Sequence, residues 1–259
     1  MDSRLKAFQR ILNIMDDLRE KCPWDSVQTI ESLRTLTIEE VYELSDAIIS
    51  KDMQEIKKEL GDLMLHLVFY SKIGTETNDF DIEDVLNTIS DKLVYRHPHI
   101  YSDVKVENSE EVADNWEELK LKEKGGNGCV LCGLPNALPA MIKANRIQQK
   151  ARGVGFDWEK KEQVWDKISE ELSELKDEIK VNDQDKIEAE FGDMLFSIIN
   201  AARLYGVNPE NALERTNQKF ISRFNYLESK TIKKGKSLKS MSLEEMEKIW
   251  QEAKRFDKE

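Results

Sequence analysis

The sequence contains only three cysteines and three histidines, and neither residue type forms a complete catalytic or metal-binding motif. Three cysteines do not make a disulfide framework, which favours a reducing compartment such as the cytoplasm. Cys129 and Cys132 have the spacing of half a zinc site, but only Cys22 remains as a further thiol. The pair also lacks the context of a thioredoxin-like redox motif. Nucleophilic, redox and structural-zinc sites are therefore disfavoured.

Long apolar runs and an excess of positive charge are also missing. No run approaches the ~20 residues that a membrane-spanning helix needs, and residues 1–10 lack the apolar region of a signal peptide. The 39 basic residues are outnumbered by 51 acidic ones, and the net charge of −12 disfavours a broad electrostatic grip on DNA, RNA or an anionic membrane. We therefore expect a cytoplasmic protein without nucleic-acid or membrane partners, although a small polyanion held through a metal ion remains compatible.

No segment alternates polar and apolar residues as a β-strand would, whereas apolar residues recur with helical spacing almost throughout. The sequence therefore predicts an all-α protein. The expected helices lie near residues 5–20, 29–49, 53–73, 81–95, 109–124, 137–151, 160–181, 184–205, 209–229 and 242–256. A segment rich in glycine, residues 124–135, contrasts with its surroundings. We expect it to link an N-terminal domain, residues 1–123, to a C-terminal domain, residues 136–259.

One pattern of acidic residues occurs twice with the same internal spacing. Glu171 follows Glu40 by 131 residues, and every other acidic position of the pattern is shifted by the same number. The first copy has Glu39, Glu40, Glu43, Glu59 and Asp62, and the second has Glu170, Glu171, Glu174, Glu190 and Asp193. A solvated helix face has no reason to keep such spacing through two repeats, so the duplication indicates a shared function or fold.

The spacing within each copy places the acidic residues together. Side chains three and four residues apart share one helix face. If the two helices of a copy run antiparallel, four carboxylates converge and repel one another, and a divalent cation would relieve this repulsion. Oxygen ligands suit Mg²⁺, with Mn²⁺ as a possible substitute. Apolar runs follow each acid pair, so these carboxylates border a core.

Basic pairs with helical spacing follow each acidic pattern. Lys219 and Arg223 lie in the second half, and Lys92 and Arg96 lie at matching places in the first. A metal ion bridging phosphate oxygens, together with nearby cations, is what binding of a triphosphate requires. One tryptophan lies late in each half, Trp116 in the first and Trp250 in the second, and each either stacks on a base or fills the core.

Gly61 and Gly192 occupy equivalent places inside expected helices, where glycine costs about 1 kcal/mol relative to alanine. We interpret this repeat as a sign of close packing or close approach of a ligand.

Several motifs together resemble the MazG nucleoside triphosphate pyrophosphohydrolases. They are Cys22-Pro23-Trp24-Asp25, the doubled acidic pattern, Arg96-His97-Pro98-His99 and Val154-Gly155-Phe156-Asp157-Trp158. The resemblance covers nearly the whole chain. It implies two all-α MazG-like domains, a homodimer whose helical bundles are completed between chains, and Mg²⁺-dependent hydrolysis of NTPs or dNTPs to the monophosphate and pyrophosphate, as in clearing of unwanted nucleotides.

The resemblance also implies roles for individual residues. Glu171, Glu174, Glu190 and Asp193 would be metal ligands and catalytic residues, with Glu40, Glu43, Glu59 and Asp62 as the first-half metal ligands. Nucleotide contacts would come from Lys167, Glu170, Asn200, Lys219, Arg223 and Trp250. Lys92, Arg96 and Trp116 would form a possible second nucleotide site.

The two copies differ at two of these positions. Leu36 stands where the second half has Lys167, and Phe69 stands where it has Asn200. We therefore expect catalysis in the C-terminal half. Two alternatives are a di-iron carboxylate bundle and a non-catalytic nucleotide-binding sensor. The first normally uses Glu-x-x-His pairs, whereas aspartate occupies the histidine positions here. The second would tolerate loss of an acidic residue, yet both copies keep all four.

Overall fold

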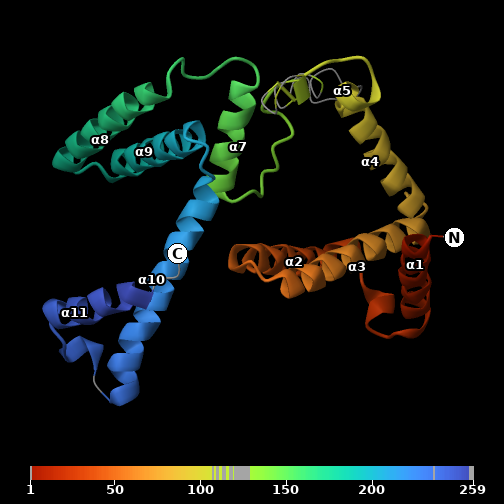
Figure 1. The fold of residues 1–259 in the computed structure, drawn as a ribbon, viewed down its shortest axis with the longest axis horizontal. Helices are drawn as coiled ribbons and strands as arrows, with labels where there is room; N and C mark the ends of the chain where they lie inside the picture. The colour runs from red at the N-terminus through yellow and green to blue at the C-terminus, as the bar shows by residue number, and fades with distance from the viewer. Residues whose placement is uncertain are drawn as a thin grey trace. The chain divides into compact units, whose positions relative to one another are not determined.

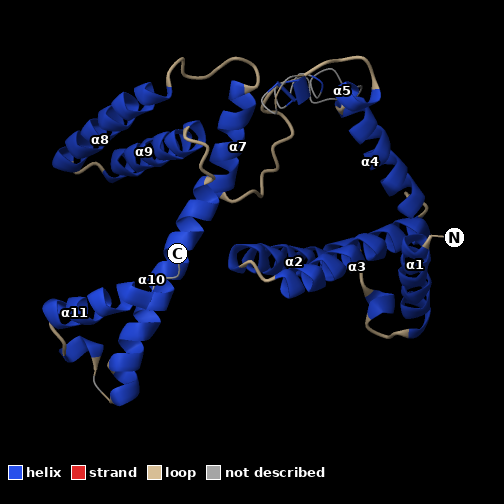
Figure 2. Ribbon diagram, viewed as in Figure 1, coloured by secondary structure: helices blue, strands red, loops and turns tan. Residues whose placement is uncertain are grey.

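The computed structural model describes residues 2–106, 108, 111, 112, 115, 116, 119, 129–235 and 237–256. Within this part of the chain every regular element is a helix, so the predicted all-α class is confirmed (Figure 2). The chain divides into two compact units, Met1–Glu107 and Asn108–Glu259. The helix expected near 109–124 and the first five residues of the expected linker fall largely outside the described residues.

The first unit is built around a helical hairpin. Its elements are α1 (Ser3–Lys21), η1 (Asp25–Val27), α2 (Ile30–Ser50), α3 (Met53–Thr77), α4 (Ile82–Arg96) and α5 (Pro98–Tyr101). Helices α2 and α3 form the hairpin, and α1 packs against α3 (Figure 1). The core of the unit consists of Met15, Leu33, Val68, Phe69 and Ile73. Because this core joins all three helices, it fixes α2 and α3 side by side.

The second unit repeats the hairpin and adds three further α-helices among its described residues. Its elements are α7 (Ala140–Arg152), η2 (Lys161–Gln163), α8 (Val164–Val181), α9 (Gln184–Leu204), α10 (Pro209–Lys230), η3 (Ile232–Lys234), η4 (Leu238–Ser240), α11 (Leu243–Ala253) and η5 (Lys254–Phe256). Helices α8 and α9 form the hairpin, and α7 packs against α9. Figure 1 shows α11 against the C-terminal part of α10, away from the α8–α9 hairpin.

The two hairpins turn in the same way at equivalent residues. Lys51 after α2 and Asn182 after α8 both adopt the left-handed conformation, with φ of 59° and 62°. The next residue caps the second helix of each hairpin. The Asp52 side chain accepts hydrogen bonds from the Gln54 and Glu55 amides, and the Asp183 side chain accepts one from the Lys186 amide. The two copies therefore share the geometry of the hairpin turn as well as the spacing of the acidic residues.

Each hairpin buries one face and leaves a second apolar face exposed. Leu60 on α3 is 53% exposed and Leu195 on α9 is 55% exposed. Gly61 and Gly192 contribute to this open surface, since an added Cβ at either would meet no atom within 4 Å. The expectation of close packing at these glycines is therefore wrong within this chain.

None of the described helices is long and apolar enough to cross a membrane. Cys129 and Cys132 form a disulfide across three residues, and Cys22 is a free thiol.

Candidate functional site: two acidic clusters

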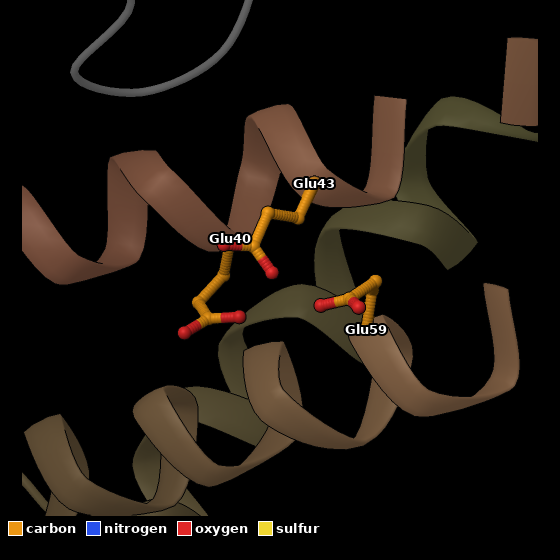
Figure 3. A group of neighbouring side chains, drawn as sticks. All are labelled: Glu40, Glu43 and Glu59. Carbon is orange, nitrogen blue, oxygen red and sulfur yellow. The ribbon is translucent and has the colours of Figure 1, made fainter. Parts of the chain in front are cut away.

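The first acidic pattern forms a cluster between α2 and α3. Glu40 and Glu43 on α2 and Glu59 on α3 each place a carboxylate oxygen within 4.8 Å of the others. Figure 3 shows the side chains from the two helices turned toward one another. Glu59 is only 3% exposed, so the cluster reaches into the hairpin rather than lying on a solvated face.

The second acidic pattern forms the equivalent cluster between α8 and α9. Glu171 and Glu174 on α8 and Glu190 on α9 again bring carboxylate oxygens within 4.8 Å of one another. Glu171 is 5% exposed. The sequence spacing predicted that four acids of each copy converge, and the structure brings three of the four within 4.8 Å of one another.

The fourth acidic residue of each pattern lies near its cluster but outside that spacing. The charge of Asp62, together with burial and the other acids, raises the pKa of Glu40, with burial as the largest cause. The pKa of Glu190 is likewise raised, first by burial and then by Glu174, Asp193 and Glu171. Asp62 and Asp193 thus add negative charge to the clusters.

The donor set fits a hard divalent cation. One carboxylate oxygen of Glu59 and one of Glu190 are buried without a hydrogen-bond partner. A buried carboxylate oxygen without a partner is costly, and a cation would supply the missing interaction. The ligands are all oxygen atoms, which suits Mg²⁺ or Mn²⁺ better than a thiolate- or imidazole-preferring metal. The clusters can therefore bind a metal ion.

One lysine contacts each acidic cluster. It comes from the first helix of the hairpin, α8, in the second unit and from the second helix, α3, in the first unit. In the second unit Lys167 Nζ lies 2.8 Å from Glu171 Oε1 and 2.9 Å from Glu170 Oε1, and these hydrogen bonds raise the pKa of Lys167. In the first unit Lys58 Nζ lies 2.9 Å from Glu59 Oε1. Lys167 belongs to the first turn of α8, where backbone amides also favour anions. The second cluster therefore has a cation beside it that the first lacks at the equivalent position.

The two residues that replace Lys167 and Asn200 in the first half belong to its core. Phe69 is 2% exposed, and Leu36 packs against the same buried cluster. Arg19 covers the Phe69 ring, with its guanidinium carbon 5.5 Å from the ring centroid. Both side chains are apolar, with Phe69 buried and Leu36 partly buried, so neither offers a polar ligand a hydrogen bond.

Asn200 in the second unit belongs instead to a polar network that the sequence did not reveal. Its side-chain oxygen accepts hydrogen bonds from Arg203 Nε at 3.0 Å and Nη2 at 2.8 Å. Arg203 in turn donates to both carboxylate oxygens of Asp157, at 2.9 and 2.5 Å. In the sequence, Asp157 belongs to the motif Val154-Gly155-Phe156-Asp157-Trp158, for which no individual role is predicted. Arg203 is one of many charged residues. Only the fold brings residues 46 positions apart into contact.

The predicted basic pair and late tryptophan assemble on α10 and α11. The Arg223 guanidinium carbon lies 5.7 Å from the Trp250 ring centroid, and Phe220 packs against the same ring at 5.0 Å. Lys219 lies one turn before Arg223 on α10. Because α11 packs on the C-terminal part of α10, this group lies away from the α8–α9 acidic cluster of the same chain (Figure 1). One chain therefore does not bring the two predicted parts of the site together.

The first-half basic residues Lys92 and Arg96 lie on α4, which follows the α2–α3 hairpin. Trp116 stands in a stretch of which the structure describes only single residues.

A hydrogen-bonded network specific to the first unit lies beside its acidic cluster. Thr37 Oγ1 is 2.8 Å from His66 Nδ1 and 2.7 Å from Tyr70 Oη. His66 is buried and lies one helical turn after Asp62. Burial lowers the pKa of His66, while the charge of Asp62 opposes this effect. The imidazole is therefore held neutral within the helical hairpin.

We expect His66→Gln to make the protein less sensitive to mild acid. Because the folded-state pKa of His66 is lowered, the unfolded chain binds its proton more readily, so this contribution to stability is lost as pH falls below the ordinary value of 6.5. Glutamine retains a polar contact but does not titrate. Thermal denaturation from about pH 5 to 8 should show a smaller acid-induced drop in Tm for the variant. Parallel curves for the two proteins would contradict this assignment.

The comparisons with known proteins agree with this geometry. The MazG nucleotide pyrophosphohydrolase domain matches residues 28–101 and 159–227, segments that contain the two acidic clusters. The chain is 40% identical to the nucleoside triphosphate pyrophosphohydrolase of Escherichia coli K12 over 97% of its own length and 98% of that protein. It is 42% identical to the nucleoside triphosphate pyrophosphohydrolase/pyrophosphatase MazG of Thermotoga maritima, over 96% of each chain.

A further relative, the Bacillus subtilis protein YabN, is 43% identical over 97% of this chain and 52% of its own length. The family match covers both hairpins, and similarity to the Escherichia coli and Thermotoga maritima enzymes extends over nearly the full length of each. The chain therefore belongs to the MazG nucleotide pyrophosphohydrolase family.

Proposed function

We propose that the C-terminal half hydrolyses nucleoside triphosphates, with ribose or deoxyribose, to the monophosphate and pyrophosphate. The observation that carries this proposal is the cluster of Glu171, Glu174 and Glu190, whose oxygens lie within 4.8 Å of one another beside the ammonium of Lys167. The names of two full-length relatives support the same reaction. Removal of unwanted nucleotides in the cytoplasm is the corresponding cellular role.

In this proposal the acidic residues hold Mg²⁺, with Asp193 as the fourth ligand and Mn²⁺ as a substitute. When bound there, the ion supplies charge neutralisation to the phosphates and lowers the pKa of attached water. Lys167 binds a phosphate oxygen at the start of α8, and Glu170 beside it contacts the nucleotide. A carboxylate beside the metal orients the attacking water. Asn200 contacts the substrate further along α9.

We further propose that two copies of the chain complete the site. Helices α9 and α10 expose apolar side chains, which are Phe191, Leu195, Phe196, Ile198, Leu213, Phe220, Ile221 and Phe224. Helices with one packed and one exposed apolar face are typical of bundles that close on association. In a homodimer, Lys219, Arg223 and Trp250 of one chain reach the acidic cluster of the other chain. These three residues supply the basic pair and the aromatic ring that the acidic cluster does not meet within its own chain.

The first half keeps its acidic cluster, and we propose that it binds metal in a structural or regulatory role. Lys92, Arg96 and Trp116 would serve a second nucleotide site there. Leu36 and Phe69 weaken such a site, since both belong to the apolar packing of the unit.

Product analysis across a panel of NTPs and dNTPs tests the proposed activity. With Mg²⁺ present, pyrophosphate and the monophosphate should appear together. Orthophosphate as the first product would exclude the pyrophosphohydrolase reaction for this chain.

A further inference from the structure

The amide of Asn200 is oriented by its neighbours. Both hydrogen bonds from Arg203 end on Asn200 Oδ1, at 3.0 and 2.8 Å. Among the described residues none accepts a hydrogen bond from Asn200 Nδ2. An asparagine amide offers one acceptor and two donor hydrogens. With the oxygen engaged twice by a guanidinium, the amide presents its N–H donors and rotation to the opposite orientation is disfavoured.

Arg203 is itself held in place. Its side chain is 9% exposed and donates to both oxygens of Asp157, a two-bond geometry that fixes the plane of the guanidinium. Asp157 also accepts a hydrogen bond from the Trp158 amide. Burial favours the neutral acid, but the hydrogen bonds from Arg203 and Trp158 lower the pKa of Asp157. The Asp157 carboxylate is therefore favoured, and the two hydrogen bonds hold the Arg203 guanidinium in one plane.

The position of Asn200 relates it to a particular part of a nucleotide. Asn200 follows Asp193 by seven residues, so it lies on the same face of α9 about two turns, or roughly 10 Å, further along the axis. Phosphates held at the acidic cluster would place the sugar and base, rather than another phosphate, at this distance. The amide donors therefore face the nucleoside part of the substrate.

We infer that Arg203 and Asp157 are positioning residues that fix Asn200 as a hydrogen-bond donor to an acceptor atom on the sugar or base. This inference rests on the proposed function of the second unit. The equivalent residues of the first unit form no such network. Phe69 replaces Asn200, and Lys72, in the place of Arg203, pairs with Asp16 at 2.7 Å. The arrangement is therefore a device of the second site and not a general feature of the hairpin.

A double-mutant cycle tests whether Arg203 acts through Asn200. Asn200→Ala and Arg203→Leu should each raise KM by roughly tenfold with little change in kcat, because each removes the same oriented donor. The double variant should be no worse than Asn200→Ala alone. Arg203→Lys keeps the positive charge but cannot make the two parallel hydrogen bonds of a guanidinium, so its KM should resemble that of Arg203→Leu. Lys72→Met is the matched control and should leave the kinetics unchanged.

Multiplied losses in the double variant, or a fall in kcat with KM unchanged, would show that Arg203 supports the fold rather than Asn200. If Arg203→Leu does not fold, the same cycle is measured with Arg203→Lys and Asp157→Asn in its place.

Comparison of ribo- and deoxynucleotides then identifies which acceptor atom of the substrate Asn200 contacts. A KM effect of Asn200→Ala confined to ribonucleotides identifies the 2′-oxygen, and one that depends on the base identifies a base atom.

An equal KM effect on every nucleotide identifies an acceptor on the sugar that all of them share. Absence of pyrophosphate release from every nucleotide by the unmodified chain would overturn the proposed function. A normal KM in Arg203→Leu, in a chain that is otherwise active, would overturn only the inference about Arg203.

Discussion

Replacing Glu174 by Gln together with Asp193 by Asn should abolish turnover, whereas Glu43→Gln with Asp62→Asn should leave most activity in place. The first pair removes two proposed metal ligands from the site that also has Lys167 and Asn200. Loss of the metal's contribution to transition-state charge is worth several kcal/mol, or roughly a thousandfold in rate. The second pair changes a cluster whose neighbouring positions, Leu36 and Phe69, are part of an apolar core.

The difference follows from what each half can offer a phosphate or a sugar. Each polar group left without a partner costs about 1–3 kcal/mol, so two missing contacts weaken binding roughly a hundredfold or more. Steady-state kinetics of both purified double variants, with circular dichroism to verify their helical content, measures the effect. Equal losses would indicate two working sites, and the reverse order would place catalysis in the first half.

Mixing two inactive variants should restore activity if the site is shared between chains. One variant carries Glu174→Gln and Asp193→Asn, and the other carries Lys219→Ala and Arg223→Ala. In a mixed dimer one site has both damaged parts, while the other combines intact acids from one chain with intact cations from its partner. After subunit exchange, half of the dimers are mixed and each has one good site of two, which gives roughly a quarter of the parent activity.

This complementation separates a shared site from one completed within a single chain. If each chain supplied its own cations, every site in the mixture would carry a defect and no activity would return. The two variants are co-refolded or co-expressed with different affinity tags, so that the mixed dimer is isolated and its turnover measured. A mixed dimer that remains inactive, although each variant is folded and dimeric, would contradict the proposed arrangement.

Local rules predicted much of the fold and the acidic clusters. Glu40 and Glu43, or Glu171 and Glu174, lie on one helix face whatever the rest of the chain does, and a short turn returns the next helix antiparallel. The αL residues Lys51 and Asn182 followed by capping aspartates show how the repeat specifies this turn. The acids therefore converge for reasons that lie within about 25 residues of sequence.

Contacts between distant segments were not predictable in the same way. The direction of α10 relative to α9 depends on packing against α7, and it decides that Lys219 and Arg223 lie away from the acids of their own chain. The Asp157–Arg203 pair joins residues 46 positions apart in a chain that is 35% charged, where a single arginine carries no signal. For Gly61 and Gly192 the prediction of close packing was wrong, because an added Cβ at either would meet no atom within 4 Å.

The position of a solvent oxygen atom tests the proposed reaction most directly. The enzyme is incubated with an NTP and Mg²⁺ in water enriched in ¹⁸O. The products are then separated, and the mass of each is measured by mass spectrometry. Attack of water on the α phosphorus, with pyrophosphate as the leaving group, places the label in the nucleoside monophosphate and none in pyrophosphate. Label in free orthophosphate or in pyrophosphate, with the monophosphate unlabelled, would contradict the assignment of this site as a pyrophosphohydrolase centre.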